Sequence, residues 1–290
     1  MAETAVRVRG LRKCYRDVPA VDGIDLDIAH GEVFALLGPN GAGKTTTVEI
    51  LEGYRKRDAG EVAVLGRDPA RADRRWRARV GIVFQTSGEA PELTVREVVR
   101  HFAGYYPSPR DPDAVIAAVG LTEKAGARVR ALSGGQRRRL DVALGILGSP
   151  ELIFLDEPTT GFDPEARRRF WTLIESLAAD GTTILLTTHY LDEAEALADR
   201  VAVVAGGRIV ETNTPAALGG RAAGTARVSW LADDGPRSVE TDTPAKVVAD
   251  LAARFGGEVP ELLVTRPTLE DVYLELIAAD GAGDRDGARS

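Results

Sequence analysis

The stretch from Val33 to Thr46 constrains the fold of this chain more than any other part of its sequence. An apolar run over residues 33–37 leads into residues 38–46, GPNGAGKTT, and a helical pattern follows. Glycines at 38, 41 and 43 let the backbone wrap closely around an anion, and the helix start supplies positive potential. A strand before and a helix after are the context that confirms the phosphate-loop pattern G-x-x-x-x-G-K-[ST]. We therefore expect a nucleotide-binding α/β core.

The loop residues have separate expected roles. Lys44 should reach the β- and γ-phosphates of a nucleotide, and the Thr45 hydroxyl should be a ligand of Mg²⁺. The residues expected to bind nucleotide here are Gly38, Pro39, Asn40, Gly41, Ala42, Gly43, Lys44, Thr45 and Thr46. A glycine-rich turn with a chance lysine is the alternative, and the strand and helix on either side argue against it.

A second motif of a nucleotide-hydrolysing enzyme is an apolar strand that ends in an acid. Residues 152–157, LIFLDE, supply it. Asp156 is placed to hold Mg²⁺, and Glu157 is the candidate general base for an attacking water. The alternative is a strand that ends in a solvated acidic loop. An Asp-Glu pair after four apolar residues, in a chain that also has a phosphate loop, favours the catalytic interpretation.

The pattern of apolar segments predicts an α/β fold with a mainly parallel sheet. Several runs are continuous, which is typical of strands buried on both faces, and amphipathic helical stretches lie between some of them. A mostly helical subdomain, at about residues 86–149, is expected as an insertion. A small α+β extension is expected at 225–279, and a disordered tail at 280–290. The apolar runs are residues 6–8, 24–28, 33–37, 62–65, 80–84, 152–155, 183–187 and 201–204.

The segment that narrows the class of nucleotide-binding protein is LSGGQ: Leu132, Ser133, Gly134, Gly135 and Gln136. A small hydroxyl, two glycines and a helix start make a second anion-binding device in the same chain. Here the sequence resembles the ABC ATPase family, whose signature motif this is, over roughly residues 4–218. The resemblance implies a head-to-tail dimer with a second copy. In it, the signature of one subunit would close on the ATP bound by the other.

The resemblance assigns roles to four further residues. Gln85 matches the glutamine that approaches Mg²⁺ and the lytic water, and His189 matches the histidine that contacts the γ-phosphate. Asp163 matches the aspartate that communicates across the dimer. Tyr15 matches the aromatic residue that stacks on adenine. The chain departs from the family at Phe162, where leucine is usual, and this apolar exchange should preserve function.

Composition and the absence of long apolar runs predict a cytoplasmic protein. The net charge of −7 argues against a nucleic-acid partner, and no apolar run is long enough to span a bilayer. The single cysteine, Cys14, suits a reducing compartment. Attachment to the inner face of the cell membrane would therefore depend on a separate permease.

The branch of the family is indicated by the segment between the motifs and by the C-terminus. Fewer than 90 residues separate Lys44 from Ser133, which leaves no room for a long coiled coil. Residues 266–274, RPTLEDVYL, resemble the tail of drug- and polysaccharide-exporting ATPases, with Thr268 as helix cap and Asp271 as its capping-box partner. We expect an exporter subunit for a drug, lipid or polysaccharide. A soluble non-transport ATPase, an importer subunit and a scaffold without turnover are the alternatives.

Overall fold

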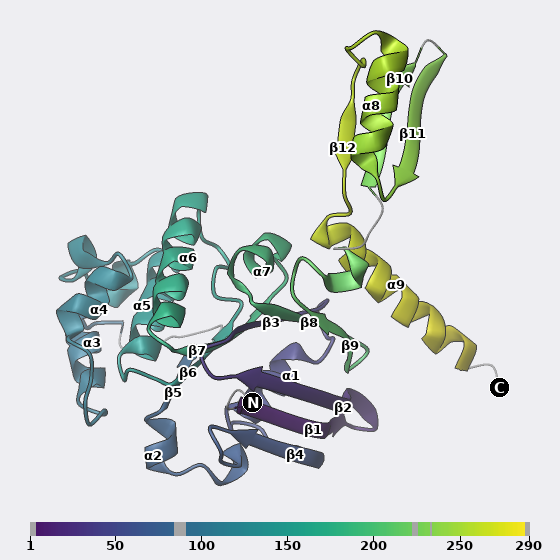
Figure 1. The fold of residues 1–290 in the computed structure, drawn as a ribbon. Coiled ribbons are helices and arrows are strands. Elements are labelled where there is room, and N and C mark those ends of the chain that lie inside the picture. The colour runs from purple at the N-terminus through teal and green to yellow at the C-terminus, as the bar shows by residue number, and fades with distance from the viewer. Residues whose placement is uncertain (1–3, 84–90, 222–225, 233, 288–290) are drawn as a thin grey trace. The chain divides into compact units, whose positions relative to one another are not determined.

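A computed structural model of the chain describes residues 4–83, 91–221, 226–232 and 234–287 (Figure 1). The chain divides into two compact units between Thr212 and Asn213. The sequence predicted the boundary at 218, and packing explains the difference. The turn Leu218–Gly220 contacts the last helix of the second unit, and a Cβ on Gly219 would lie 2.1 Å from Val272 Cγ1. The segment that leads to this turn therefore belongs to the second unit.

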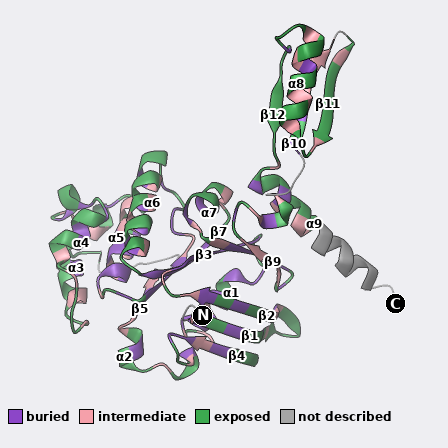
Figure 2. Cartoon of the chain, viewed as in Figure 1, coloured by how far each residue is buried: buried purple, intermediate pink, exposed green. Residues whose placement is uncertain are grey.

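The first unit is built on a six-stranded sheet with the order β5-β6-β7-β3-β8-β9. The pairs from β5 through β8 are parallel, as the continuous apolar runs predicted. Every residue of β3 and β7 is buried (Figure 2). The bounds are β3 Val33–Leu37, β5 Val80–Val83, β6 Leu152–Asp156, β7 Thr183–Thr188, β8 Arg200–Ala205 and β9 Arg208–Asn213.

Three of the expected strands form a separate antiparallel sheet with the order β2-β1-β4. These strands are β1 Thr4–Tyr15, β2 Val18–Ala29 and β4 Ala59–Val64. Buried and exposed residues are interspersed along β1 and β2, because one face of this sheet meets solvent. Its buried face shares one hydrophobic core with α1 (Lys44–Leu51) and with Phe34 and Leu36 of β3.

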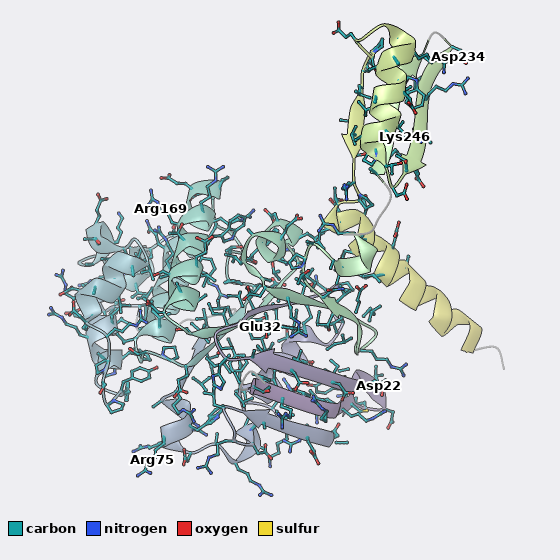
Figure 3. The ribbon with its side chains drawn as sticks, viewed as in Figure 1. Asp22, Glu32, Arg75, Arg169, Asp234 and Lys246 are labelled. Atoms are coloured by element: carbon teal, nitrogen blue, oxygen red, sulfur yellow. The ribbon has the colours of Figure 1, made fainter. Side chains whose placement is uncertain are left out.

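Ion pairs join parts of the first unit that are far apart in sequence. Asp22 on β2 accepts hydrogen bonds from Arg12 and Arg208, so it links the antiparallel sheet to the edge strand β9 (Figure 3). Glu32 is buried just before β3 and pairs with Arg200 of β8 at 3.1 Å. Cys14 lies on the outer part of β1 and is exposed.

Helices cover the parallel sheet on the side opposite the antiparallel sheet (Figure 1). They are α5 Gly134–Ile146, α6 Pro164–Ala179 and α7 Leu191–Leu197. The short helix α2 (Arg74–Arg77) buries Trp76, whose indole N–H donates to the Val64 carbonyl at 2.9 Å. The expected helical insertion contains α3 (Val95–Ala103), α4 (Pro112–Ala118) and α5. Its first residues, 86–90, lie outside the described ranges.

The second unit is the small α+β extension that the sequence predicted. Its sheet has the order β11-β10-β12, and α8 (Pro244–Phe255) packs on β10 through Leu251 and Val228. The strands are β10 Ala226–Ala232, β11 Gly235–Thr241 and β12 Leu263–Thr265. The last helix is α9, Leu269–Gly287.

The sequence predicted a disordered tail at 280–290, but in the structure α9 continues to Gly287. The cap at Thr268 nucleates the helix, and adding residues to an existing helix is much easier than starting one. Among the described helices, none is both long and apolar enough to cross a bilayer.

Candidate functional site

The loop between β3 and α1 is closely packed against neighbouring backbone. Gly43 has a φ of 100°, and a Cβ there would lie 2.2 Å from the carbonyl oxygen of Ala20. A Cβ on Gly38 would lie 2.3 Å from the carbonyl oxygen of Val204. Only glycine fits at these two points, so the phosphate-loop pattern here reflects a steric requirement of the fold as well as a binding function.

The N-terminus of α1 is open toward the loop. Gly43 is its N-cap, no described side chain caps it, and its first turn contains no acid. Free backbone N–H groups and the helix dipole therefore present positive potential to an anion. Lys44 is buried beside them, and its ammonium donates to the carbonyl oxygens of Gly38 at 2.6 Å and Pro39 at 3.1 Å.

A cavity of about 330 Å³ lies over this helix start. Six residues of the loop and of α1 line it, and Asp156 and Glu157 line its other side. Ala20, which the sequence did not single out, completes the lining from the antiparallel sheet. The residues from the loop and α1 are Asn40, Gly41, Gly43, Lys44, Thr45 and Thr46. The two sequence motifs therefore meet at one cavity.

The electrostatics of the cavity depend on a buried cation facing two acids. Burial lowers the pKa of the Lys44 ammonium, while the nearby charges of Glu157 and Asp156 oppose that effect. A phosphate in the cavity would add negative charge beside Lys44 and so favour its charged form. This arrangement suits a polyphosphate better than a neutral ligand.

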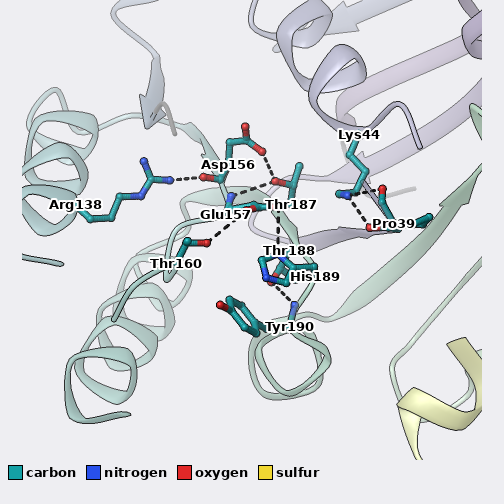
Figure 4. Close-up of polar contacts among 11 residues, drawn as sticks. Pro39, Lys44, Arg138, Asp156, Glu157, Thr160, Thr187, Thr188, His189 and Tyr190 are labelled. Carbon is teal, nitrogen blue, oxygen red and sulfur yellow. Dashed lines mark hydrogen bonds and ion pairs between the residues drawn. The ribbon is translucent and has the colours of Figure 1, made fainter. Parts of the chain in front are cut away.

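The end of β6 is held by the neighbouring strand β7. The Thr187 hydroxyl donates to the Asp156 carboxylate, and the Glu157 N–H donates to the Thr187 carbonyl oxygen at 3.1 Å (Figure 4). Register explains the contact, because Asp156 pairs with Thr187 across the two parallel strands. Thr187 was not expected as a site residue. Its position at the end of a strand next to the acidic strand is the signal that could have found it.

Glu157 and His189 are in direct contact. The His189 Nδ1 lies 3.1 Å from Glu157 Oε1, and the Thr160 hydroxyl donates to Glu157 Oε2 at 3.4 Å (Figure 4). Glu157 is mostly buried, whereas His189 is partly exposed. The structure thus brings together two residues that the sequence placed 32 positions apart.

Tyr15 stands at the end of β1, close to the turn into β2. Tyr15 is 40% exposed, and the Arg55 guanidinium lies 5.3 Å from the centroid of its ring. Tyr15 is not among the described residues that line the cavity, although Ala20 of the same hairpin is. The structure therefore leaves its stacking role a prediction. Gln85 lies outside the described residues.

The LSGGQ segment forms the start of α5. Ser133 is the N-cap: the Gln136 N–H donates to its hydroxyl at 3.3 Å, and the Ser133 N–H donates to Gln136 Oε1 at 3.0 Å. Leu132 is buried, while Ser133 and Gly134 are exposed. A Cβ on Gly134 would meet no described atom within 4 Å. Nothing in the described part of this chain therefore requires glycine there.

Asp163 caps the start of α6. Its carboxylate accepts from the Ala166 N–H at 2.8 Å, and this bond keeps the pKa of Asp163 below its usual value. Phe162, the departure from the family pattern, is buried with its ring edge-on to Phe170 at 5.9 Å between centroids. The larger ring is accommodated in the core.

Comparison with known proteins decides the family. Residues 21–160 match the family described as ABC transporter. The daunorubicin resistance ATP-binding protein DrrA3 of Streptomyces coeruleorubidus is 37% identical over 309 residues, covering 97% of this chain and 98% of that protein. The chain belongs to the ABC transporter family of ATP-binding subunits. It is an ABC ATPase, and the resemblance seen in its motifs is confirmed.

Further relatives agree with this assignment. The Nod factor export ATP-binding protein I of Rhizobium meliloti (strain 1021) is 39% identical over 297 residues, covering 94% of this chain and 88% of that protein. A solved ATP-binding subunit of an ABC transporter covers 94% of this chain with a TM-score of 0.71 at 22% identity. A dimeric ATP-binding cassette bound to ADP and phosphate covers 72% of it with a TM-score of 0.66 at 24% identity. These two structures show that the ABC ATPase fold was predicted correctly.

The donor set of the cavity fits Mg²⁺ as a partner of ATP. Thr45 and Asp156 both line the cavity and offer a hydroxyl and a carboxylate. Mg²⁺ in nucleotide sites uses one or two protein oxygens together with phosphates and water, so a cage of acids is not needed. The described residues accordingly contain no cluster of three or more metal-binding His, Cys, Asp or Glu side chains.

Proposed function

We propose that this ABC ATPase hydrolyses ATP as a head-to-tail dimer with a second copy of itself and powers export through a separate membrane permease. The observation that carries the proposal is the meeting of Lys44, Asp156 and Glu157 at one cavity, with His189 on Glu157. That set provides phosphate binding, a metal ligand, a general base and a histidine partner.

Each residue has a distinct task in the proposed reaction. The N–H groups of the loop and of α1 hold the phosphates, and Lys44 transfers its hydrogen bonds from loop carbonyls to phosphate oxygens. Glu157 accepts the proton of the attacking water, and His189 orients Glu157 and contacts the γ-phosphate. Thr45 and Asp156 would hold Mg²⁺, with Gln85 as a third ligand, and the metal would neutralise charge on the phosphates.

The dimer is supported by the exposed signature start. Ser133 and Gly134 are exposed, and neither is among the described residues that line the cavity of their own chain. A helix start with an uncrowded glycine suits close approach of a phosphate from a second copy. Asp163, at the N-terminus of α6, would then communicate between the two sites.

Export is supported by the relatives rather than by the cavity. Two of them carry names for daunorubicin resistance and Nod factor export, which are exporter functions. We infer a drug, lipid or polysaccharide as cargo, with the subunit bound to the cytoplasmic face of the membrane through its permease. A non-transport ATPase or an importer subunit of the same family would show the same cavity, so co-purification of a permease from membranes separates these alternatives.

The deciding experiment replaces Glu157 with Gln. The variant should bind ATP normally, accumulate as an ATP-bound dimer in size-exclusion chromatography, and lose turnover by about 10²-fold or more, since a general base contributes that much. Adding Ser133→Arg to it should abolish the dimer but leave ATP binding intact. Full turnover by Glu157→Gln would exclude Glu157 as the base, and a dimer in the double variant would exclude the shared site.

A further inference from the structure

The backbone at Glu157 adopts a conformation that side chains other than glycine rarely adopt. Its φ is 46°, in the left-handed region, although Glu157 is a large residue with a Cβ. Strained backbone of this kind persists only where surrounding contacts hold it, and it is found preferentially at active sites. The turn directs the carboxylate toward His189, so whatever holds the turn also determines where the base points.

Two sets of contacts hold this turn. On one side, the Glu157 N–H donates to Thr187 of β7. On the other side, the Arg138 guanidinium of α5 donates to the carbonyl oxygen of Asp156 (Figure 4), and its Nε donates to that of Pro158 at 3.3 Å. These two carbonyls belong to the residues immediately before and after Glu157. Arg138 therefore forms hydrogen bonds with the backbone on both sides of the strained residue.

The burial of Arg138 shows that this contact is a fixed part of the structure. Only 7% of the residue is exposed, and a buried cation is stable only where it is paired and hydrogen-bonded. Burial lowers the pKa of the Arg138 guanidinium, and the negative charges of Asp141, Asp156, Glu157 and Glu193 oppose that effect. A planar guanidinium can reach two carbonyls at once, which a flexible ammonium cannot do equally well.

We propose that Arg138 is a positioning residue that fixes the left-handed turn at Glu157 and so aims the catalytic carboxylate at the attacking water. Arg138 lies on the helix that begins at Ser133, so the signature helix and the base of one subunit are joined by this contact. The proposal rests on the proposed role of Glu157 as general base.

The first test compares Arg138→Met with Arg138→Lys and a control. In Arg138→Met the turn should relax, and kcat should fall about 100-fold, the loss that a misplacement of about 1 Å produces. KM for ATP should change by less than about twofold, because the phosphate loop is untouched. Arg138→Lys, which keeps the charge but not the two-carbonyl contact, should lose about tenfold. ATP-binding stoichiometry counts the folded fraction in each sample.

Arg139→Met is the matched control. Arg139 is the next residue of the same helix, and it also donates to a backbone carbonyl, that of Gly120 at 3.0 Å, but away from Glu157. We expect near-normal kcat per folded molecule in this variant. A loss as large as that of Arg138→Met would mean that general loosening of α5, and not the contact with the turn, causes the defect.

The second test separates positioning from a purely structural role by a double-variant cycle. If Arg138 acts through Glu157, then Arg138→Met should leave the residual rate of Glu157→Gln unchanged within about twofold. A further 100-fold loss in that background would overturn the proposal. So would an increased KM with normal kcat. Arg138→Lys serves in the same cycle if Arg138→Met does not fold. Full turnover by Glu157→Gln alone contradicts the proposed base, a result distinct from either outcome of the cycle.

Discussion

At the scale of single residues, Glu52 shows how burial beside Asp156 affects stability. It follows α1 directly and is 9% exposed. Burial, followed by the negative charges of Asp156 and Glu49, raises the pKa of Glu52 from 4.5 to about 8. The folded chain therefore keeps a proton on Glu52 over a pH range in which the unfolded chain releases it.

The prediction from Glu52 concerns the pH dependence of stability. Because its folded pKa is raised, Glu52 contributes most to stability below its unfolded pKa, and this contribution is lost as pH rises toward about 8. Glu52→Gln should remove this loss, so its free energy of unfolding should gain on wild type by about 1.4 kcal/mol per pH unit between about pH 5 and 8. Urea unfolding at several pH values measures it. Parallel curves would contradict the shift.

The sequence predicted some site residues and could not reveal others. Lys44, Asp156 and Glu157 lie in motifs whose spacing encodes strand, loop and helix, and the cavity unites them. Arg138 is the middle of three successive arginines, and only the fold shows that it is buried while Arg137 is exposed. Such contacts depend on which helix face meets the end of β6, and no motif carries that information.

At the scale of elements, the start of α9 is well defined. The Asp271 N–H donates to the Thr268 hydroxyl at 3.1 Å, and the Thr268 N–H donates to Asp271 Oδ2 at 2.8 Å. This confirms the predicted capping box, with aspartate in the usual glutamate position. The bonds that the Thr268 N–H and hydroxyl donate to the carboxylate also lower the pKa of Asp271, so the cap is strongest where this carboxylate is charged.

Removing the cap gives a prediction for α9. Thr268→Ala should lower the free energy of unfolding of the second unit by about 1 kcal/mol, because the Asp271 N–H loses its acceptor and the Asp271 carboxylate loses the hydroxyl that donates to it. Thr268→Ser keeps the hydroxyl and should lie close to wild type. Amide hydrogen exchange in residues 269–276 reports the effect locally. Equal protection in all three proteins would show that packing, rather than the cap, fixes the helix start.

Element prediction failed where side chains face solvent. Strand β11 was not expected, because most of its residues are exposed and its sequence, GPRSVET, has no apolar run. Strand β11 is held in an extended conformation by its partner β10, which pairs with it along its full length, from Ala226 with Thr241 to Ala232 with Gly235. Pairing of this kind depends on another segment of the chain. The strands of the parallel sheet, in contrast, can be recognised in the sequence because they are buried on both faces and are therefore continuously apolar.

At the scale of the whole molecule, two of the hydrophobic cores formed by described residues lie in different units. One joins the antiparallel sheet, α1 and the parallel sheet, and the other joins β10 to α8. All described residues of the proposed ATP site lie in the first unit. No described residue of the second unit lines the cavity.

This division predicts that the chain ended at Thr212 folds and binds ATP. Its Kd should stay within about threefold of the full chain, since every contact of the cavity is retained and binding energy follows contacts. Circular dichroism checks the fold, and titration with a fluorescent ATP analogue checks binding. A fragment that folds but does not bind the ATP analogue would show that the second unit supports the site.

The exposed Cys14 has a practical consequence. It is the only thiol in the chain, it neighbours Tyr15, and its backbone N–H is anchored to Asp58 at 2.7 Å. A spin label would therefore attach at one defined point of each subunit without any engineering. If the proposed dimer forms, the separation between the two labels would report how far apart the subunits lie as ATP is bound and hydrolysed, with no residue of the chain substituted.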